Sequence, residues 1–197
     1  NIVDIVKPIT KLAKCIYSTR EFEATIIEAI QIAKSGRPGP VWIDIPVNLQ
    51  WEDIKYKSIA NEKKDNTINT NIKMDNKLFN QSVNWIIKSK KPLFILGYGL
   101  RLSNTQDNII NILNKACIPF VTSWNAADYS STDNKYNMGT IGMFGQRGAN
   151  KIVFDSDLIV CLGTHLSAAH TTNLTDNYAK KAKKIIVNID KNQLDNL

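Results

Sequence analysis

The feature that most constrains the fold is a strand-helix-strand pattern between residues 92 and 122. An apolar run at 93–96 stops at the glycine turn 97–99, and apolar residues at helical spacing follow over 109–116. A second apolar run occupies 120–122. Two strands joined by a helix at this length form a βαβ unit, which predicts a parallel sheet with a right-handed crossover. Because the strands are apolar throughout, we expect the sheet to be buried on both faces.

Helices and strands alternate along the rest of this region. A helical stripe of apolar residues begins at Asn76, and a short helix is predicted over 145–154. Further strands are predicted at 158–162 and 185–189, while the segment after Thr122 has the composition of a loop. This order predicts an α/β fold with a doubly wound, mostly parallel, Rossmann-like sheet.

The first fifty residues predict a separate, smaller piece of structure. Ser18 and Glu21 have the spacing of a capping box, and Gly36 suits the residue just past the end of the helix that follows. A strand is predicted at 41–45, where Pro46 stops it. One helix and one strand bury too little for a core of their own, so they must belong to a larger sheet or dock onto the rest of the chain.

Composition sets the domain limits and excludes several classes of function. Residues 51–73 are polar and rich in Lys and Asn, which is typical of a linker, and they divide residues 1–50 from a main domain at 74–197. The net charge of +7 comes from scattered Lys, without the Arg forks and interleaved aromatics of a nucleic-acid site. No apolar run is long enough to span a membrane. The absence of an initial Met suggests a piece of a longer chain.

The three cysteines indicate the compartment. Cys15, Cys117 and Cys161 are odd in number, far apart and flanked by apolar residues. We interpret them as buried thiols in a reducing compartment, which predicts a cytoplasmic protein.

The predicted sheet also predicts where a ligand would bind. Ligands of such sheets sit beyond the carboxyl ends of the strands, so residues 97–99 and 122–125 would line one crevice. The Gly-x-Gly turn at 97–99 is half of a phosphate-binding fingerprint, but a simple strand-ending turn explains it nearly as well. From the residues alone, a nucleotide-binding module and a purely structural domain both stay open.

Two parts of the chain resemble thiamine-diphosphate-dependent enzymes, in particular the acetolactate synthase large subunit. The stretch SGRPGPVWIDIP at 35–46, with PITK at 8–11 before it, resembles the end of the domain that binds the pyrimidine ring of the cofactor. The stretches GMFGQRGAN at 142–150 and VNID at 187–190 resemble the central domain. The resemblance therefore implies a helix-strand remnant of another α/β domain at 1–50, the C-terminal part of a pyrimidine-binding domain, and a central domain, incomplete at its C-terminus, at 74–197.

The resemblance also implies an activity. The family uses thiamine diphosphate and Mg²⁺ as a transferase or lyase that forms or cleaves carbon–carbon bonds in 2-oxo acids or related carbonyl substrates, as a homodimer or homotetramer. Its activating glutamate lies before the start of this chain, and its metal motif, GDG followed by an Asn pair, lies after Leu197. We therefore expect no catalytic or metal-binding residue here, and no activity from the chain alone.

In acetolactate synthase the glycine turn lies against flavin adenine dinucleotide (FAD), and the resemblance carries a cofactor-binding set over to this sequence. That set is Gly97, Gly99, Thr122, Ser123, Trp124, Gly142, Met143, Phe144, Gly145, Gln146, Gly163 and Asp190. Flavin-binding relatives hold the dinucleotide with two Arg, and His165 and Ala169 stand in their places here. The loss of two permanent cations predicts that the chain does not bind flavin.

Three other polar residues remain open or unassigned. We interpret His165 and His170 as loop-surface residues, since no cluster of ligands completes a metal site around them. Arg147 either faces the cofactor cavity or pairs with an acidic residue such as Asp155, and the sequence does not decide between the two.

Overall fold

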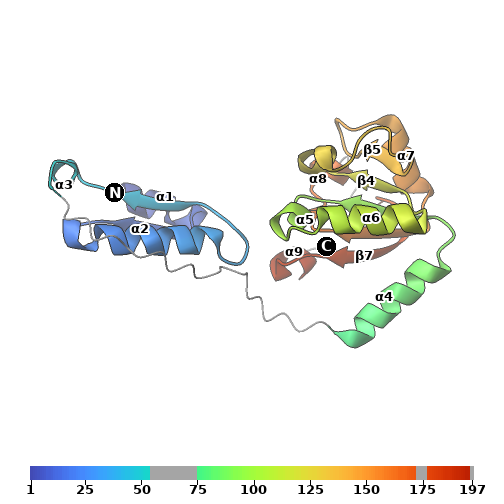
Figure 1. Cartoon of the computed structure of the whole chain (residues 1–197), viewed down its shortest axis with the longest axis horizontal. Coiled ribbons are helices and arrows are strands. Elements are labelled where there is room, and N and C mark those ends of the chain that lie inside the picture. Colours follow the sequence, from blue (N-terminus) through green and yellow to red (C-terminus); the bar gives the residue numbers. More distant parts are fainter. Residues whose placement is uncertain (54–74, 172–176, 196–197) are drawn as a thin grey trace. The chain divides into compact units, whose positions relative to one another are not determined.

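The computed structural model describes residues 1–53, 75–171 and 177–195 (Figure 1). The chain splits into two compact units, Asn1–Lys73 and Met74–Leu197. Most of the predicted linker at 51–73 lies outside the described residues. No helix in the part of the chain that the structure describes is both long and apolar enough to cross a membrane.

The first unit is a parallel strand pair with a connecting helix. Its elements are α1 (Ile2–Val6), a 3-10 helix (Lys7–Ile9), β1 (Leu12–Cys15), α2 (Thr19–Lys34), β2 (Val41–Asp44) and α3 (Val47–Gln50). The predicted capping box forms at the start of α2, where the Glu21 carboxylate accepts a hydrogen bond from the Ser18 N–H at 3.1 Å. Gly36 follows the helix with a φ of +50°, as its predicted position requires.

The prediction of one helix and one strand for this unit was wrong, because it missed β1. That strand pairs in parallel with β2, Leu12 lying opposite Val41. Four residues with a lysine among them do not give a period-2 signal. The lysine is accommodated because its ammonium leaves the strand pair for α2, where Lys14 Nζ donates to Thr25 Oγ1 at 3.2 Å.

The described strands of the second unit form one all-parallel sheet in the order β5-β4-β3-β6-β7. They are β3 (Pro92–Leu96), β4 (Phe120–Thr122), β5 (Asn137–Thr140), β6 (Leu158–Leu162) and β7 (Lys183–Val187). The helical elements are α4 (Asn76–Lys88), α5 (Gly99–Leu102), α6 (Gln106–Ala116), a 3-10 helix (Trp124–Tyr129), α7 (Arg147–Asp155), α8 (Ala168–Thr171) and α9 (Lys191–Asp195). The chain winds outward from β3 in one direction and from β6 in the other. The predicted α/β, doubly wound fold is confirmed.

Both faces of this sheet are buried, as the unbroken apolar runs predict. Along β3, Leu93 and Ile95 enter one core with residues of α7, while Phe94 and Leu96 enter the other with residues of α6. Figure 1 shows α6 lying across one face of the sheet. Each fully buried aliphatic side chain contributes about 1.5–3 kcal/mol, so these two cores fix the strand positions independently of any ligand.

Several local features of the second unit differ from the predictions. The edge strand β5 has the sequence NMGT, too polar to be recognised as a strand. Strand β7 begins at Lys183, two residues before the predicted range, because at the edge of a sheet its lysines stay exposed. Helix α6 begins at Gln106, and Asn104 adopts a φ of +54° in the turn before it.

The cysteines were not all placed correctly by the sequence. Cys161 is buried in β6, where burial raises the pKa of its thiol to about 12. Cys15 is only half-buried, and Cys117 is exposed at the end of α6, contrary to the prediction of three buried thiols. The position after a helix end faces solvent whatever its apolar neighbours in sequence. All three are free thiols.

Candidate functional site at the carboxyl end of the sheet

The glycine turns that follow β3 and β6 lie directly against each other. Gly99 N–H donates to the Gly163 carbonyl at 2.8 Å, and Gly97 N–H donates to the Leu162 carbonyl at 2.9 Å. A Cβ atom on Gly97 would lie 2.3 Å from the Gly163 oxygen, and one on Gly99 would lie 2.7 Å from the Gly163 Cα. Contact between two backbones therefore explains these glycines, and the interpretation as a strand-ending turn is favoured.

The predicted lining residues at the end of β4 hold this edge of the sheet together. Thr122 and Thr140 share a hydrogen bond between their hydroxyl oxygens at 3.1 Å, which joins β4 to β5. Ser123 N–H donates to the Leu96 carbonyl at 2.9 Å, which joins β4 to β3. Trp124 donates its indole N–H to the Ile141 carbonyl at 3.1 Å. Thr122 and Ser123 are buried, so only Trp124 of the three offers a substantial surface to a ligand.

The loop between β5 and α7 is folded against its own helix. Gly142 has a φ of +107°, and its peptide group forms two hydrogen bonds of 2.9 Å with the side-chain amide of Asn150. A Cβ on Gly145 would lie 2.2 Å from the Thr140 oxygen, and the Gln146 side chain accepts a hydrogen bond from the Thr140 N–H. The role of Asn150 was missed, although it belongs to the GMFGQRGAN stretch.

Aromatic side chains from three segments meet at the mouth of this region. The Trp124 ring lies 5.5 Å from the ring of Phe144 and 5.7 Å from that of His170. The segments are also joined through Met143 N–H, which donates to the Ala169 carbonyl at 2.8 Å. His170 is therefore not simply a loop-surface residue: it lies in α8, it is half-buried with its ring tilted at 59° to that of Trp124, and its Nδ1 lies 2.9 Å from the His165 carbonyl oxygen. Phe144, by contrast, is 80% exposed.

The arginine beside the glycine turn is already neutralised by protein groups. Arg101 places Nη2 2.9 and 2.8 Å from the two carboxylate oxygens of Asp128, and this hydrogen-bonded pair lowers the pKa of Asp128. Its guanidinium also lies over the rings of Tyr98 and Tyr129, at 5.7 and 5.0 Å from their centroids. Tyr129 in turn donates its hydroxyl to the Gly97 carbonyl at 3.1 Å. The sequence analysis missed this network, for which no local motif exists.

Two further sequence predictions can be placed. Asp190 lies just beyond β7, whose Val187 carbonyl accepts a hydrogen bond from Gly163 N–H at 3.0 Å. The sequence suggested Asp155 as a partner for Arg147. The Asp155 carboxylate forms an ion pair with Lys151, at 2.6 Å. Among the residues that the structure describes, no cluster of three or more His, Cys, Asp or Glu side chains is placed to hold a metal ion.

Comparison with known proteins identifies relatives along nearly the whole sequence. Residues 79–197 match the family described as thiamine pyrophosphate enzyme, central domain. The acetolactate synthase large subunit of Haemophilus influenzae is 27% identical over 192 residues, which cover 96% of this chain and 33% of that protein. The corresponding subunit of Pyropia yezoensis is 30% identical over 96% of this chain. The isozyme 1 large subunit of Escherichia coli is 29% identical over 95% of it.

These matches concern only part of each relative. The chain spans about a third of the length of the curated relatives it matches, between 32% and 33% for the three named above. The alignments include the first unit as well as the second, since they cover 95–96% of the chain.

Proposed function

This chain belongs to the family of thiamine pyrophosphate enzymes, whose central domain it contains, and on that premise we propose that it is one part of a larger enzyme. That enzyme forms or cleaves carbon–carbon bonds in 2-oxo acids or related carbonyl compounds, as a transferase or lyase. The observation that carries the proposal is the match of 95–96% of the chain, in one continuous order, to acetolactate synthase large subunits. We further propose that residues 1–50 end the pyrimidine-binding domain.

In this proposal the chain contributes architecture and not the reacting groups. In the larger enzyme, thiamine diphosphate bound with Mg²⁺ would supply the nucleophilic chemistry at the substrate carbonyl. The glutamate and the GDG…Asn motif that serve the cofactor in the family do not occur in this sequence. The parallel sheet of the second unit, rigid through its two buried cores, instead supplies a fixed support for neighbouring domains. We propose a cytoplasmic homodimer or homotetramer as the working form.

The residues at the carboxyl end of the sheet do not fit flavin as an additional cofactor. A diphosphate needs cations or free N–H groups, and glycine turns that bind it leave space for it. Here the space beside Gly97 and Gly99 is filled by the Gly163 turn, and Arg101 is held by Asp128. We therefore propose that the chain belongs to a branch of the family that does not use this dinucleotide.

Enzyme assays on two proteins test the proposed function. The purified 197-residue chain, given thiamine diphosphate, Mg²⁺ and pyruvate, should consume no pyruvate, because it lacks the activating glutamate and the metal ligands. The protein encoded by the complete reading frame of its gene should bind thiamine diphosphate and turn over a 2-oxo acid. An acetolactate synthase serves as the positive control. Turnover by the chain alone, or a complete protein that ignores the cofactor, would contradict the proposal.

A further inference from the structure

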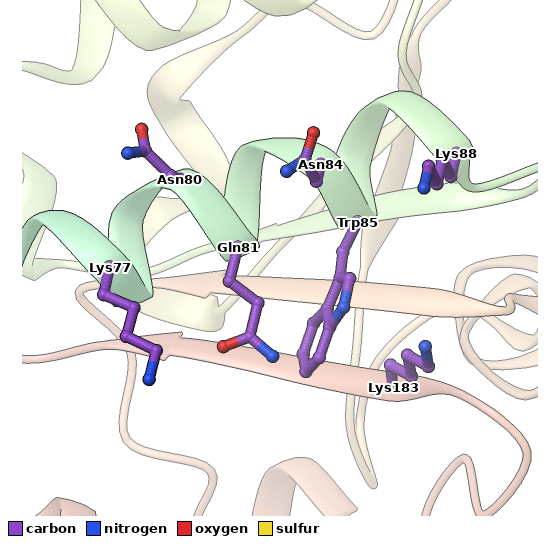
Figure 2. A pocket seen from close by; sticks show the side chains of 7 residues that line it. All are labelled: Lys77, Asn80, Gln81, Asn84, Trp85, Lys88 and Lys183. Atoms are coloured by element: carbon purple, nitrogen blue, oxygen red, sulfur yellow. The ribbon is translucent and has the colours of Figure 1, made fainter.

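A pocket lies between helix α4 and strand β7, away from the carboxyl ends of the strands. Its volume is about 700 Å³, within the range of small-molecule sites. Figure 2 shows Lys77, Gln81 and Trp85 reaching from α4 toward β7, which carries Lys183. The described lining residues include three lysines, namely these two and Lys88, and no Asp or Glu.

The lysines that line the pocket are separated by a distance greater than the diameter of one phosphate group. Lys77 and Lys88 are eleven residues apart on α4, which corresponds to roughly 16 Å at 1.5 Å per residue. The side-chain amides of Gln81 and Asn84 lie between them on the helix. Across the gap, Lys183 Nζ lies 4.9 Å from the centroid of the Trp85 ring, which holds this ammonium at the pocket wall.

Helix α4 packs against the core through Trp85 and Ile86, and it presents polar side chains beside Trp85 to the pocket. Leu78, Phe79 and Ile87 are exposed to the extent of 60%, 49% and 74%, and none of the described residues of α4 is buried. Lys77, Gln81 and Trp85 instead point toward β7, while Asn80 and Asn84 point away from it (Figure 2). An amphipathic helix normally packs its apolar stripe inward. A gap lined by lysines and amides is suited to a polar, anionic occupant and poorly suited to an apolar one.

The amino end of the sheet adds more positive charge beside the pocket. Asp157 joins the lysine-rich segments 88–91 and 180–184, because its N–H donates to the Lys91 carbonyl and its own carbonyl accepts from Lys183 N–H. The acids nearby are engaged: the Asp157 carboxylate accepts from Ser89 and two backbone N–H groups, and Asp155 pairs with Lys151. Asp75 caps α4 through the N–H groups of Lys77 and Leu78. The electrostatic potential here favours an anion.

We propose that the α4–β7 pocket binds a small molecule that carries two or more phosphate groups. Separate ammonium groups can meet phosphate oxygens from several directions without the fixed geometry that a guanidinium requires. The amide of Gln81, which points toward β7, supplies a hydrogen-bond donor between Lys77 and Lys183, and Trp85 forms an apolar wall. A nucleic-acid duplex is a poorer occupant, because the described residues that line the site include no arginine and only one aromatic ring, that of Trp85. The site is independent of the thiamine chemistry proposed above.

The test is a titration of the purified 197-residue chain with inorganic pyrophosphate and, separately, with ADP at low ionic strength. Both ligands should bind saturably by calorimetry, compete with each other, and weaken as salt is added. Binding should also change the fluorescence of Trp85, and Trp85→Phe should remove that signal. Lys183→Gln and Lys88→Gln should each weaken pyrophosphate about tenfold, equivalent to about 1.4 kcal/mol.

A matched control separates the pocket from general surface charge. Lys135 lies 4.9 Å from the centroid of the Tyr136 ring, the same contact as that of Lys183, but outside the pocket. Lys135→Gln should leave pyrophosphate binding unchanged. The proposal is overturned if neither ligand binds, if ADP binds while pyrophosphate does not, or if Lys135→Gln weakens binding as much as Lys183→Gln. Preferential binding of a DNA duplex over pyrophosphate would equally overturn it.

Discussion

The carboxyl end of the central sheet and the α4–β7 pocket use their polar groups in opposite ways. At the carboxyl end, protein partners occupy the groups that a ligand would need: Gly99 N–H is bonded to Gly163, and Arg101 to Asp128. At the pocket, the described lining residues include three lysines and no acidic side chain. The first region carries the recognisable motif, and the second carries the charge that is available to a ligand.

The difference shows that a glycine motif indicates, first of all, that another backbone or a ligand comes close to the chain, and it does not by itself indicate a ligand. Both a diphosphate and a second turn can require the space that a side chain would fill. The two cases are distinguished by the atoms nearest to the place where a Cβ would stand. For Gly97 these atoms belong to Gly163 and Thr164. Lys77, Lys88 and Lys183, by contrast, form no motif in the sequence. The fold places α4, which carries the first two, beside β7, which carries the third.

The sharpest way to break this comparison is to add one methyl group at the glycine turn. Gly97→Ala places a Cβ 2.3–2.5 Å from three atoms of Gly163 and Thr164, so β3 and β6 must separate. We expect a loss of about 3 kcal/mol or more in the free energy of unfolding. Urea unfolding followed by Trp85 and Trp124 fluorescence, with Trp42 and Trp51 of the first unit replaced by Phe, measures it.

Gly148→Ala is the matched control for that substitution. Gly148 lies in α7 and a Cβ there would meet nothing within 4 Å, so the same change should stabilise the unit by up to about 1 kcal/mol. If Gly97→Ala were as harmless, the space beside the turn would be open, and the glycines would again indicate a ligand.

The sequence predicted the core of the second unit well and its edges poorly. Runs such as 93–96 and 158–162 are buried on both faces, so their apolar character alone identifies them as parallel strands. Strands β5 and β7 lie at the edges of the described sheet, where exposed positions accept Asn, Thr and Lys. Local sequence does not report partners that lie far away in the chain, which is why β1 was also missed.

The sequence named residues for the candidate site, but it did not reveal how these residues contact one another. The resemblance named residues from several segments, and of these Trp124 and Phe144 do meet, with ring centroids 5.5 Å apart. Asp128 lies 27 residues from Arg101 in sequence, and no spacing rule predicts that they pair. Whether these residues bind a cofactor remains a prediction.

At the amino end of the sheet, we expect a smaller loss of stability from replacing Asp157, and a still smaller loss from replacing the surface residue Asp155. Asp157 accepts hydrogen bonds from Ser89 and from the N–H groups of Lys90 and Lys91, and these lower its pKa. Asp157→Asn should therefore lower the melting temperature at pH 7 by a few degrees. Asp155→Asn should lower it less, because the ion pair of Asp155 with Lys151 is exposed to solvent.

The pH dependence of that difference follows from the direction of the shift. A carboxyl whose pKa is lowered on folding stabilises the protein above its unfolded value, about 3.9, and the stabilisation is lost as the pH falls through the folded pKa. The melting temperatures of the parent and of Asp157→Asn should therefore converge below about pH 4. A constant difference down to pH 2 would show that the charge of Asp157 is not what holds the start of β3.

The last prediction is that flavin has no effect on the protein, because it does not bind at the carboxyl end of the sheet. Cores on both faces hold the sheet in place without a ligand, Arg101 is paired with Asp128, and His165 and Ala169 stand where the resemblance expects two arginines. The protein should purify colourless, and added FAD should not change its melting temperature. His165→Arg with Ala169→Arg should produce measurable FAD binding, since each charge-assisted hydrogen bond contributes about 1.5–3 kcal/mol, whereas His165→Gln with Ala169→Gln should not. A yellow protein with stoichiometric flavin before any substitution would mean that the backbone N–H groups alone suffice, and that the two regions differ less than their charges indicate.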